Sequence, residues 1–469
     1  MRHPSPSLLP SLARKISTTS LLPLARASGF LRRSSKKIKP ANFLLTSCLF
    51  ALQCHGSLAA FAQLWAALHQ QSLSKQAVHK RFNAAAVRFL QAVLQSALAS
   101  LILPSSIPSA PGSPFKRILI QDSTCLSLPP KLAALFPGPA NQSQRRQGGL
   151  KIQATLDLLK NRFLAFQLTP FVVNDQKASP DIIPLLQPGD LLLRDLGYLV
   201  LDVLQQIHQQ GAYFLSRCRY GLSLWCPQSG LRLNLLEQLR RAGPFWDGNV
   251  LLGSQKLPVR LVAVRLPPAL ANERRRKARQ NRDHRLNHNP EYLQLLDWNI
   301  FLTNVPATSL SATALAELYG LRWRIEIVFK TWKSHFRLAQ LTDVSAEHLL
   351  ILILAKLIWI CWFSVHWTHL VAQGAAISLL KLAQWWSRFA VALCLRPPKL
   401  SRATCLSQIL YYCRYEKRKK RLNFLQKCAA LAGTIQIEKV EHRLLAWVNE
   451  IKLKSGASTG GEPNGAAAN

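Results

Sequence analysis

Acidic residues are scarce in this sequence, and their scarcity sets the charge of the whole chain. The 469 residues include 22 Asp and Glu against 60 Lys and Arg, which gives a formal net charge of +38. No acid occurs before Asp122, whereas that stretch carries 15 Lys and Arg. So large a positive excess is unfavourable for a compact protein unless a polyanion offsets it, and nucleic acid is the usual partner. A generally basic, high-pI lineage is the alternative.

The ten cysteines lack the spacing of a metal site. None forms a C-x-x-C pair, and no histidine completes a zinc pattern. With no secretory signal evident, we expect reduced, mostly buried thiols in a cytoplasmic protein. Segment 1–40 also has the composition of an organelle transit peptide, but the lack of acid continues for about eighty residues beyond it. A DNA-facing surface explains more of this pattern.

One long apolar run raises the question of a membrane. Residues 349–365 are almost wholly apolar, but Lys356 lies in the middle, and 17 residues is the lower limit for spanning a bilayer. A helix buried on all sides in a large protein has the same composition. We therefore predict a buried helix and no membrane partner, with a membrane span as the alternative.

The order of strand-like and helical segments predicts a mixed α/β core that is interrupted by an insertion. Between residues 116 and 218 the patterns follow the order β-β-β-α-β-α-β, which gives a sheet that is part meander and part crossover. A further strand is expected at 298–305. The predicted boundaries are a disordered basic tail at 1–42, a helical DNA-binding region at 43–103, a linker at 104–115, the first part of the catalytic core at 116–220, a β-rich basic insertion at 221–297, the second part of the core at 298–345, a C-terminal helical region at 346–455 and a disordered tail at 456–469.

A pair of short helices is expected at 57–83. Ser74 would cap the second helix. Its outer face would carry Lys75, Gln76, His79, Lys80 and Arg81. This arrangement fits a helix-turn-helix DNA reader, and an ordinary helical hairpin with a basic side is the alternative.

The segment 315–336 predicts an amphipathic helix with a reactive side. At ~100° per residue its apolar side chains face a core, and its polar ones fall within an arc of about 80°. These polar residues are Tyr319, Arg322, Glu326, Lys330 and Lys333. A surface helix often carries Glu flanked by basic residues, so the arc alone does not define a site.

Two aspartates give the helical glutamate a chemical context. Asp122 and Asp195 each follow a short apolar strand-like run, so we expect them at strand ends beside a cleft. Two such aspartates with Glu326 suit a pair of Mg²⁺ ions, because Mg²⁺ prefers carboxylate oxygens. Two ions of this kind serve in-line displacement at phosphorus, and neighbouring Arg and Lys would hold the DNA backbone.

Tyr319, Arg322, Glu326 and Lys333 reproduce the pattern Y-x2-R-x3-E-x6-K. In this the chain resembles the DDE-type bacterial insertion-sequence transposases of the insertion-sequence-four family. The resemblance covers about 116–340 and implies a ribonuclease-H-like fold whose triad would be Asp122, Asp195 and Glu326. It also implies a β-rich insertion in the 131-position interval between Asp195 and Glu326.

One position departs from the family pattern. The family commonly has Arg after the second aspartate, whereas this chain has Leu196. A phosphate contact would be lost there or supplied by Arg194, and full activity depends on which. Arg145 and Arg146 are further candidates for DNA contact, with a solvated charge cluster as the alternative. Trp298 and Trp323 are expected in the core rather than on a flipped base.

We therefore predict a transposase that cleaves DNA at the ends of its element and joins them to target DNA. Its cofactor would be two Mg²⁺ ions, with Mn²⁺ as a substitute. Its partners would be the terminal inverted repeats, target DNA and a second copy of the chain, in a bacterial cytoplasm at the nucleoid. The alternatives are a metal-dependent nuclease on the same fold and a catalytically decayed DNA-binding copy.

Overall fold

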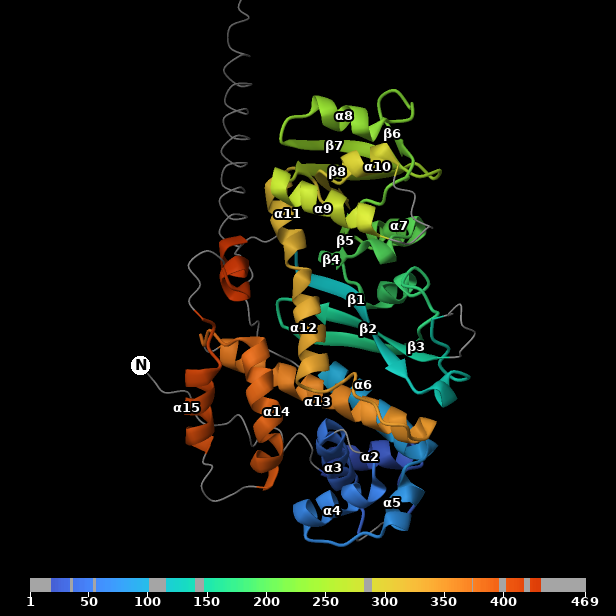
Figure 1. Cartoon of the computed structure of the whole chain (residues 1–469), viewed down its shortest axis with the longest axis vertical. Coiled ribbons are helices and arrows are strands. Elements are labelled where there is room, and N and C mark those ends of the chain that lie inside the picture. Colours follow the sequence, from blue (N-terminus) through green and yellow to red (C-terminus); the bar gives the residue numbers. More distant parts are fainter. Residues whose placement is uncertain are drawn as a thin grey trace, which may run out of the picture. The chain divides into compact units, whose positions relative to one another are not determined.

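A computed structural model describes residues 18–33, 37–53, 56–100, 115–139, 147–281, 289–372, 374–395, 402–416 and 422–431. The chain divides into two compact units, each assembled from separate segments (Figure 1). The first unit takes 1–107, 117–216 and 321–425, and the second takes 108–116, 217–320 and 426–469. The predicted C-terminal tail and residues 104–114 of the predicted linker lie outside the described residues.

A mixed sheet forms the centre of the first unit, with its strands in the order β3-β2-β1-β4-β5. The strands are β1 (Arg117–Leu128), β2 (Gly148–Asp157), β3 (Arg162–Pro170), β4 (Asp190–Arg194) and β5 (Tyr213–Arg217). β1, β2 and β3 pair antiparallel as a meander, and β1, β4 and β5 pair parallel through crossovers. The 3-10 helices η1 (Pro130–Leu132), η2 (Ser179–Leu185) and η3 (Leu196–Tyr198) and the helix α7 (Leu201–Gln209) lie in the connections. The predicted mixed α/β class is confirmed.

Strand β2, which lies between β3 and β1, is buried along its whole length. A tight turn at Asn161, which has a positive φ of 46°, joins it to β3. Asn tolerates this left-handed conformation better than most residues. Because β2 has no exposed face, its polar side chains need partners inside the protein, and Lys151 and Gln153 find them beside the site described below.

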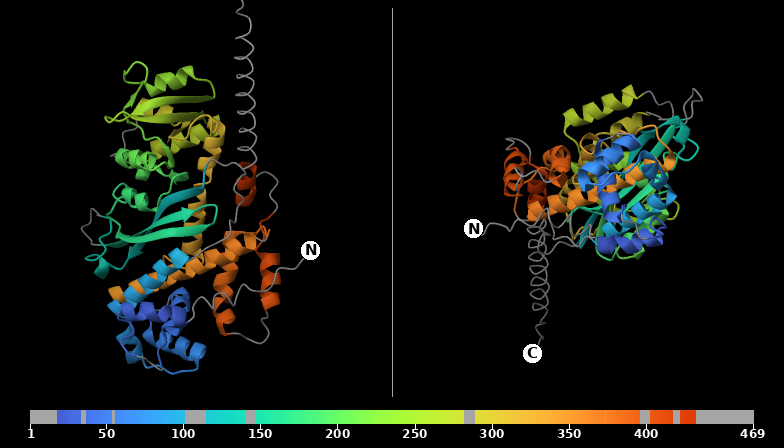
Figure 2. Two further views of the ribbon diagram at one scale, coloured as in Figure 1. Left: turned by 180° about the vertical axis from the view of Figure 1, so that it is seen from behind. Right: turned by 90° about the horizontal axis from the view of Figure 1, so that it is seen from below.

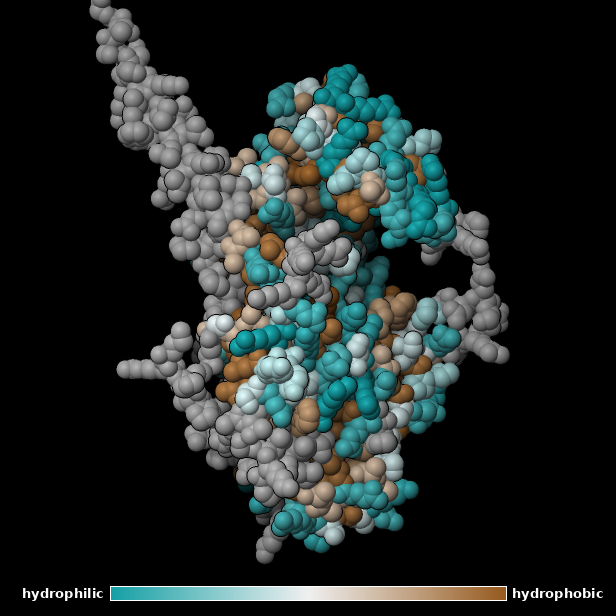
Figure 3. Space-filling model, turned by 60° about the vertical axis from the view of Figure 1, so that its left-hand side comes forward, coloured by the Kyte–Doolittle hydropathy of each residue, from teal (hydrophilic) through white to brown (hydrophobic). Residues whose placement is uncertain are grey.

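The apolar run at 349–365 lies in helix α13 (Ala346–Ala372), which packs between the sheet and the N-terminal helices. Figures 1 and 2 show α13 beside α6 (Ala84–Ser100), with α2 to α5 on the side away from the strands. The long apolar window of α13 is 94% buried inside the protein. Lys356 is 1% exposed, and its Nζ donates to the carbonyls of Arg337 (2.8 Å) and Gln340 (3.1 Å). The predicted buried helix is confirmed. On the face drawn in Figure 3, hydrophobic residues are interspersed with hydrophilic ones.

The N-terminal helices contain the expected helical pair. They are α2 (Thr18–Ala27), α3 (Pro40–Gln53), α4 (Leu58–His69), α5 (Lys75–Arg81) and α6. Gln70 ends α4 in the left-handed conformation, and the Ser74 side chain caps α5 by accepting from the N–H of Ala77 (3.2 Å). The turn and the cap stand where the sequence predicts them.

The second unit contains an antiparallel sheet in the order β9-β8-β7-β6. Its elements are β6 (Leu224–Trp225), α8 (Leu235–Arg241), β7 (Phe245–Leu252), β8 (Leu257–Arg265), α9 (Pro268–Gln280), α10 (Pro290–Leu295), β9 (Trp298–Thr303) and α11 (Ala312–Gly320). The buried Arg260 holds this unit together, because it pairs with Asp247 (2.6 Å) and donates to the carbonyls of Val305 and Leu310.

An ion pair anchors the start of β4 in the first unit. Asp190 is fully buried and accepts from Arg117 Nε (2.8 Å) and from the N–H of Gln187 (2.7 Å). We expect Asp190→Ala to lower the free energy of unfolding by about 3–5 kcal/mol in urea denaturation, because Arg117 is left largely buried without its carboxylate.

The exposed pair of Lys131 and Asp343 is the matched control. Asp343→Ala should change the free energy of unfolding by less than about 1 kcal/mol. Equal losses for the two variants would contradict a dominant role for burial.

Candidate active site

The two aspartates lie side by side because of the register between β1 and β4. The last parallel pair of these strands is Gln121 with Arg194, so Asp122 and Asp195 are the next residues of neighbouring strands that run in the same direction. Asp195 follows the end of β4, as predicted. The expectation that Asp122 ends its strand is wrong, because β1 continues beside β2 to Leu128. Asp122 instead marks the point where β1 loses β4 as a neighbour.

The glutamate comes from α12 (Trp323–Ser334), which is shorter than predicted. A single helix over 315–336 is wrong, because α11 ends at Gly320 and two i→i+3 hydrogen bonds, Arg324 N to Leu321 O and Ile325 N to Arg322 O, lead into α12. Glycine disfavours a helix interior, so a break there is reasonable. Tyr319 consequently lies on α11 in the second unit, 7% exposed and against the ring of Phe301.

Aromatic contacts fix α12 to the first unit. Its Trp332 ring packs against Phe163 and Phe166 of β3, with centroids 5.2 and 5.7 Å apart. Arg324 Cζ lies 4.6 Å from the ring centroid of Trp367 on α13 and 4.2 Å from that of Phe424. The opposite side of α12 is an accessible stripe of mixed polar and apolar residues at helical spacing. It consists of Trp323, Glu326, Ile327, Lys330 and Lys333, all exposed or half-buried.

Arg322 joins the glutamate to the first aspartate. Its Nη1 lies 3.0 Å from Asp122 Oδ2 and its Nη2 lies 2.8 Å from Glu326 Oε1. The side chain of Arg322 is 8% exposed, against 18% for Asp122 and 37% for Glu326. A buried guanidinium with two carboxylate partners is a structural cation, whereas the sequence pattern placed it on an exposed face.

The carboxylate of Asp122 is in an unfavourable environment for negative charge. Its pKa is raised to about 6, chiefly by burial and to a smaller extent by the charges of Asp195 and Glu326, while the Ser123 N–H and Arg322 act in the opposite direction. The charges of Asp195 and Glu326 therefore reach Asp122 at this edge of the sheet. The chemistry of the three carboxylates fits a hard divalent cation, which would relieve the repulsion. Among the described residues, however, no three His, Cys, Asp or Glu side chains are grouped closely enough to hold one ion as they stand. The Arg322 guanidinium lies between two of these carboxylates.

Arg194 is the alternative source of the phosphate contact that Leu196 cannot make. Its side chain is inaccessible to DNA. It is 1% exposed, and its guanidinium donates to Gln121 Oε1 (2.6 Å) and to the carbonyl of Ser179 (2.5 Å). Burial lowers its pKa to about 10. The suggestion that Arg194 replaces the missing arginine is therefore wrong, because this side chain ties β4 to β1 and η2.

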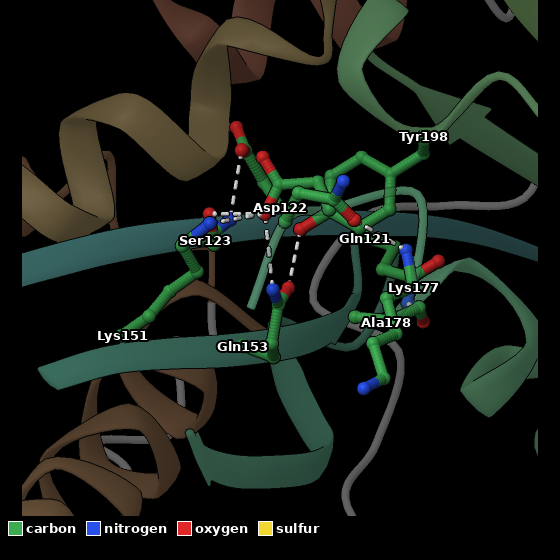
Figure 4. Close-up of polar contacts among 10 residues, drawn as sticks. Gln121, Asp122, Ser123, Lys151, Gln153, Lys177, Ala178 and Tyr198 are labelled. Carbon is green, nitrogen blue, oxygen red and sulfur yellow. Dashed lines mark hydrogen bonds and ion pairs between the residues drawn. The ribbon is translucent and has the colours of Figure 1, made fainter. Parts of the chain in front are cut away.

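A polar cluster beside Asp122 was not predicted. Figure 4 shows Ser123 of β1 and Gln153 of β2 near Tyr198, which ends η3. Asp175, in the connection between β3 and η2, accepts hydrogen bonds from Ser123, Lys151 and Gln153, and the Tyr198 hydroxyl donates to Gln153. The alternating polar residues Lys151, Gln153 and Thr155 in an otherwise apolar strand were the available signal.

The other predicted DNA-contact residues are dispersed. Lys330 and Lys333 are exposed on the Glu326 stripe, and Lys75 and Lys80 are exposed on α5. Arg81 already has a structural contact, since its Nη1 donates to the carbonyl of Phe30 (2.9 Å). Arg145 and Arg146 lie outside the described residues. Of the two tryptophans expected in the core, Trp298 is 7% exposed as expected, but Trp323 is 60% exposed.

Comparison of the sequence with known proteins identifies the family of this chain. Residues 113–362 match the family described as "Transposase DDE domain". The transposase for insertion sequence element IS231D of Bacillus thuringiensis subsp. finitimus is 32% identical over 371 residues, covering 74% of each chain. The transposase for insertion sequence element IS1151 of Clostridium perfringens is 26% identical over 357 residues, covering 71% of this chain and 75% of that one.

A solved structure, the cryo-EM structure of the piggyBac transposase synaptic complex with hairpin DNA, is 10% identical and covers 85% of this chain and 82% of its own, with a TM-score of 0.44. That score is too low to establish a shared fold. The family match over more than half of the chain, together with the IS231D relative, is sufficient: the chain belongs to the DDE insertion-sequence transposases and is an enzyme that acts on DNA.

Proposed function

We propose that this transposase cuts DNA at the ends of its insertion sequence and joins those ends to target DNA, with Asp122, Asp195 and Glu326 as its catalytic acids. One observation carries the assignment of the acids. Parallel pairing of β1 with β4 places the two aspartates on neighbouring strands, and Arg322 joins Glu326 of α12 to the first of them. We assign the chain to the insertion-sequence-four branch on its Y-x2-R-x3-E-x6-K residues, with a ribonuclease-H-like catalytic fold.

Members of the DDE transposase family depend on a divalent metal ion. Here we propose two Mg²⁺ ions, or Mn²⁺ in their place, held by Asp122, Asp195 and Glu326. Such ions, when bound, activate an attacking oxygen and stabilise the leaving oxygen of an in-line displacement at phosphorus. Hydrolysis would first free a 3′-hydroxyl at the element's end. That hydroxyl would then attack a phosphate of target DNA and release the original 3′-oxygen at that position.

The basic residues near Glu326 would hold the DNA. Lys330 and Lys333 are exposed on the same stripe, so their ammonium groups are available to phosphates beside the acids. Arg322 would orient Glu326 through its two carboxylate contacts, in place of the phosphate contact expected from the sequence. Tyr319 is kept as a proposed contact to the terminal phosphate. The exposed Trp323 is available to stack on a base, which revises the expectation that it belongs to the core.

The remaining contacts involve the helical pair and a second copy of the chain. Lys75 and Lys80 on α5 would bind the terminal inverted repeats, with Arg81 supporting the helix and Arg145 and Arg146 as further contacts. Two ends must be brought together, so we propose a homodimer in the synaptic complex. The protein would act on the nucleoid in the bacterial cytoplasm.

Strand joining tests the function directly. The purified chain, the inverted repeats that border its gene, Mg²⁺ and a target plasmid should yield joined product. Glu326→Gln should reduce cleavage by more than about 100-fold, more than the usual loss for an outer-shell partner, because an amide binds Mg²⁺ poorly. Binding of end DNA in a mobility-shift assay should change little.

Glu347→Gln, an exposed acid at the start of α13, is the matched control and should leave cleavage intact. Breaks without joined product would favour a plain nuclease on the same fold. If the wild-type chain binds end DNA without cleaving it, a catalytically decayed copy is favoured. Leu196 points to this alternative, because it stands where the family commonly has Arg. Cleavage by Glu326→Gln would disprove the assignment of the glutamate.

The salt dependence of end binding tests the lysines. Lys330→Ala and Lys333→Ala should each weaken binding and reduce the slope of log K against log salt by about 1, because each phosphate contact releases counterions. Lys131→Ala, which removes the same charge from η1, should leave the slope unchanged. An unchanged slope for all three variants would exclude the two α12 lysines from the DNA contact.

The raised pKa of Asp122 predicts a pH-dependent stability difference. The pKa of Asp122 is about 6 in the folded chain, against 3.8 for an ordinary aspartate, so the folded state holds more protons between these pH values and loses stability as pH rises through them. With a chelator present, the Tm of Asp122→Asn relative to wild type should therefore increase between about pH 4 and pH 7. A difference that is constant or decreases over this range would contradict the burial of this charge.

A further inference from the structure

Asp175 is not one of the proposed acids, but it contacts Ser123, which follows Asp122, and Gly197, two residues after Asp195. It belongs to the connection between β3 and η2, and its side chain is 27% exposed. Its Oδ1 accepts from Ser123 Oγ (3.1 Å), Lys151 Nζ (3.1 Å) and Gln153 Nε2 (3.0 Å). Three donors from two strands converge on one carboxylate oxygen, which is more than an incidental surface contact.

The first consequence of this contact concerns Asp122. Ser123 is its neighbour in the chain, and the Ser123 N–H donates to Asp122 Oδ1 (2.8 Å). Asp175 holds the hydroxyl of the same serine. Ser123 is thus fixed at both its backbone and its side chain, and the direction of the Asp122 carboxylate depends on it.

The second consequence concerns Asp195. Because the Gln153 amide donates to Asp175, its Oε1 is directed to accept from the Tyr198 hydroxyl (Figure 4). Tyr198 closes the turn that begins at Asp195, since its N–H donates to the Asp195 carbonyl (3.1 Å). Gly197 in that turn lies against Asp175, because a Cβ there would be 3.2 Å from Asp175 Oδ2. The same carboxylate therefore contacts the supports of both aspartates.

We propose that Asp175 is a positioning residue that sets the spacing and orientation of Asp122 and Asp195. This inference rests on the proposed role of those two aspartates. Partners that orient carboxylate ligands in this way contribute to metal affinity without touching the ion. The competing explanation is that Asp175 is only the counter-ion of the nearly buried Lys151, whose side chain is 9% exposed.

Full-length variants, bound to end DNA before the reaction is started, distinguish the positioning role of Asp175 from the counter-ion role. Asp175→Ala should reduce the rate constant of cleavage and the Mn²⁺ affinity, measured by electron paramagnetic resonance, each by about 10- to 100-fold. The Kd for end DNA should stay within about twofold, because no DNA contact is removed. Asp175→Asn should lose less, since its amide oxygen still accepts from Ser123. Asp181→Asn, an exposed acid on η2, is the control and should behave as wild type.

A double variant tests the counter-ion explanation. Asp175→Ala combined with Lys151→Met removes the unpaired charge, so its Tm should recover toward wild type while cleavage and Mn²⁺ affinity stay low. Recovery of cleavage and Mn²⁺ affinity together with Tm would overturn the proposal, as would normal values for Asp175→Ala. If Asp175→Ala does not fold, Tyr198→Phe is the alternative variant, because it removes only the hydroxyl. It should also lower the Mn²⁺ affinity, and an unchanged affinity would overturn the proposal.

Asp122→Asn, assayed in parallel, distinguishes this inference from the proposed function. If Asp122→Asn still cleaves DNA, the proposed acids are wrong and the basis of the inference is removed. If Asp122→Asn is inactive while Asp175→Ala is normal, the acids stand and only the positioning role fails.

Discussion

The burial of the Asp122 carboxylate beside two further acids is the constraint on which the site in the first unit depends. Burial is the main cause of the raised pKa of Asp122, and the charges of Asp195 and Glu326 add to it. Such charges stay close only where the surrounding structure prevents them from moving apart. Arg322, which bonds to two of them, supplies the compensating charge, and the strands and α12 supply the rigidity.

The rigidity comes from polar contacts at both ends of the short strand β4. At its start Asp190 pairs with Arg117 of β1, and at its end Arg194 donates to Gln121 of the same neighbour. Buried ion pairs of this kind contribute little net stability but specify one register, since a shifted pairing leaves a charge without its partner. Because the register places Asp195 beside Asp122, the specificity of these contacts matters more than their strength.

Much of this could be predicted from the sequence, and the misses have physical causes. The succession of strands along the chain, the Ser74 cap and the buried helix α13 follow from periodicity and capping, which are local properties. The assumption of one continuous helix through Gly320 failed because the periodicity of apolar residues does not register a break of only a few residues. The bridging role of Arg322 and the contacts of Asp175 depend on residues 200 and 52 positions away, respectively, and no local pattern reports such pairings.

The first unit is built from three segments of the chain, and this has a consequence for its synthesis. Asp122 and Asp195 belong to the middle segment, whereas Glu326 belongs to the segment that starts at Leu321. A ribosome therefore completes the N-terminal helices and both aspartates, and then the whole of 217–320, before the glutamate helix exists. Trp332 and Arg324 hold that helix through contacts with β3, α13 and Phe424. A growing chain thus presents its basic N-terminal helices well before the three proposed acids have all been made, so the proposed site cannot assemble until α12 has been synthesised.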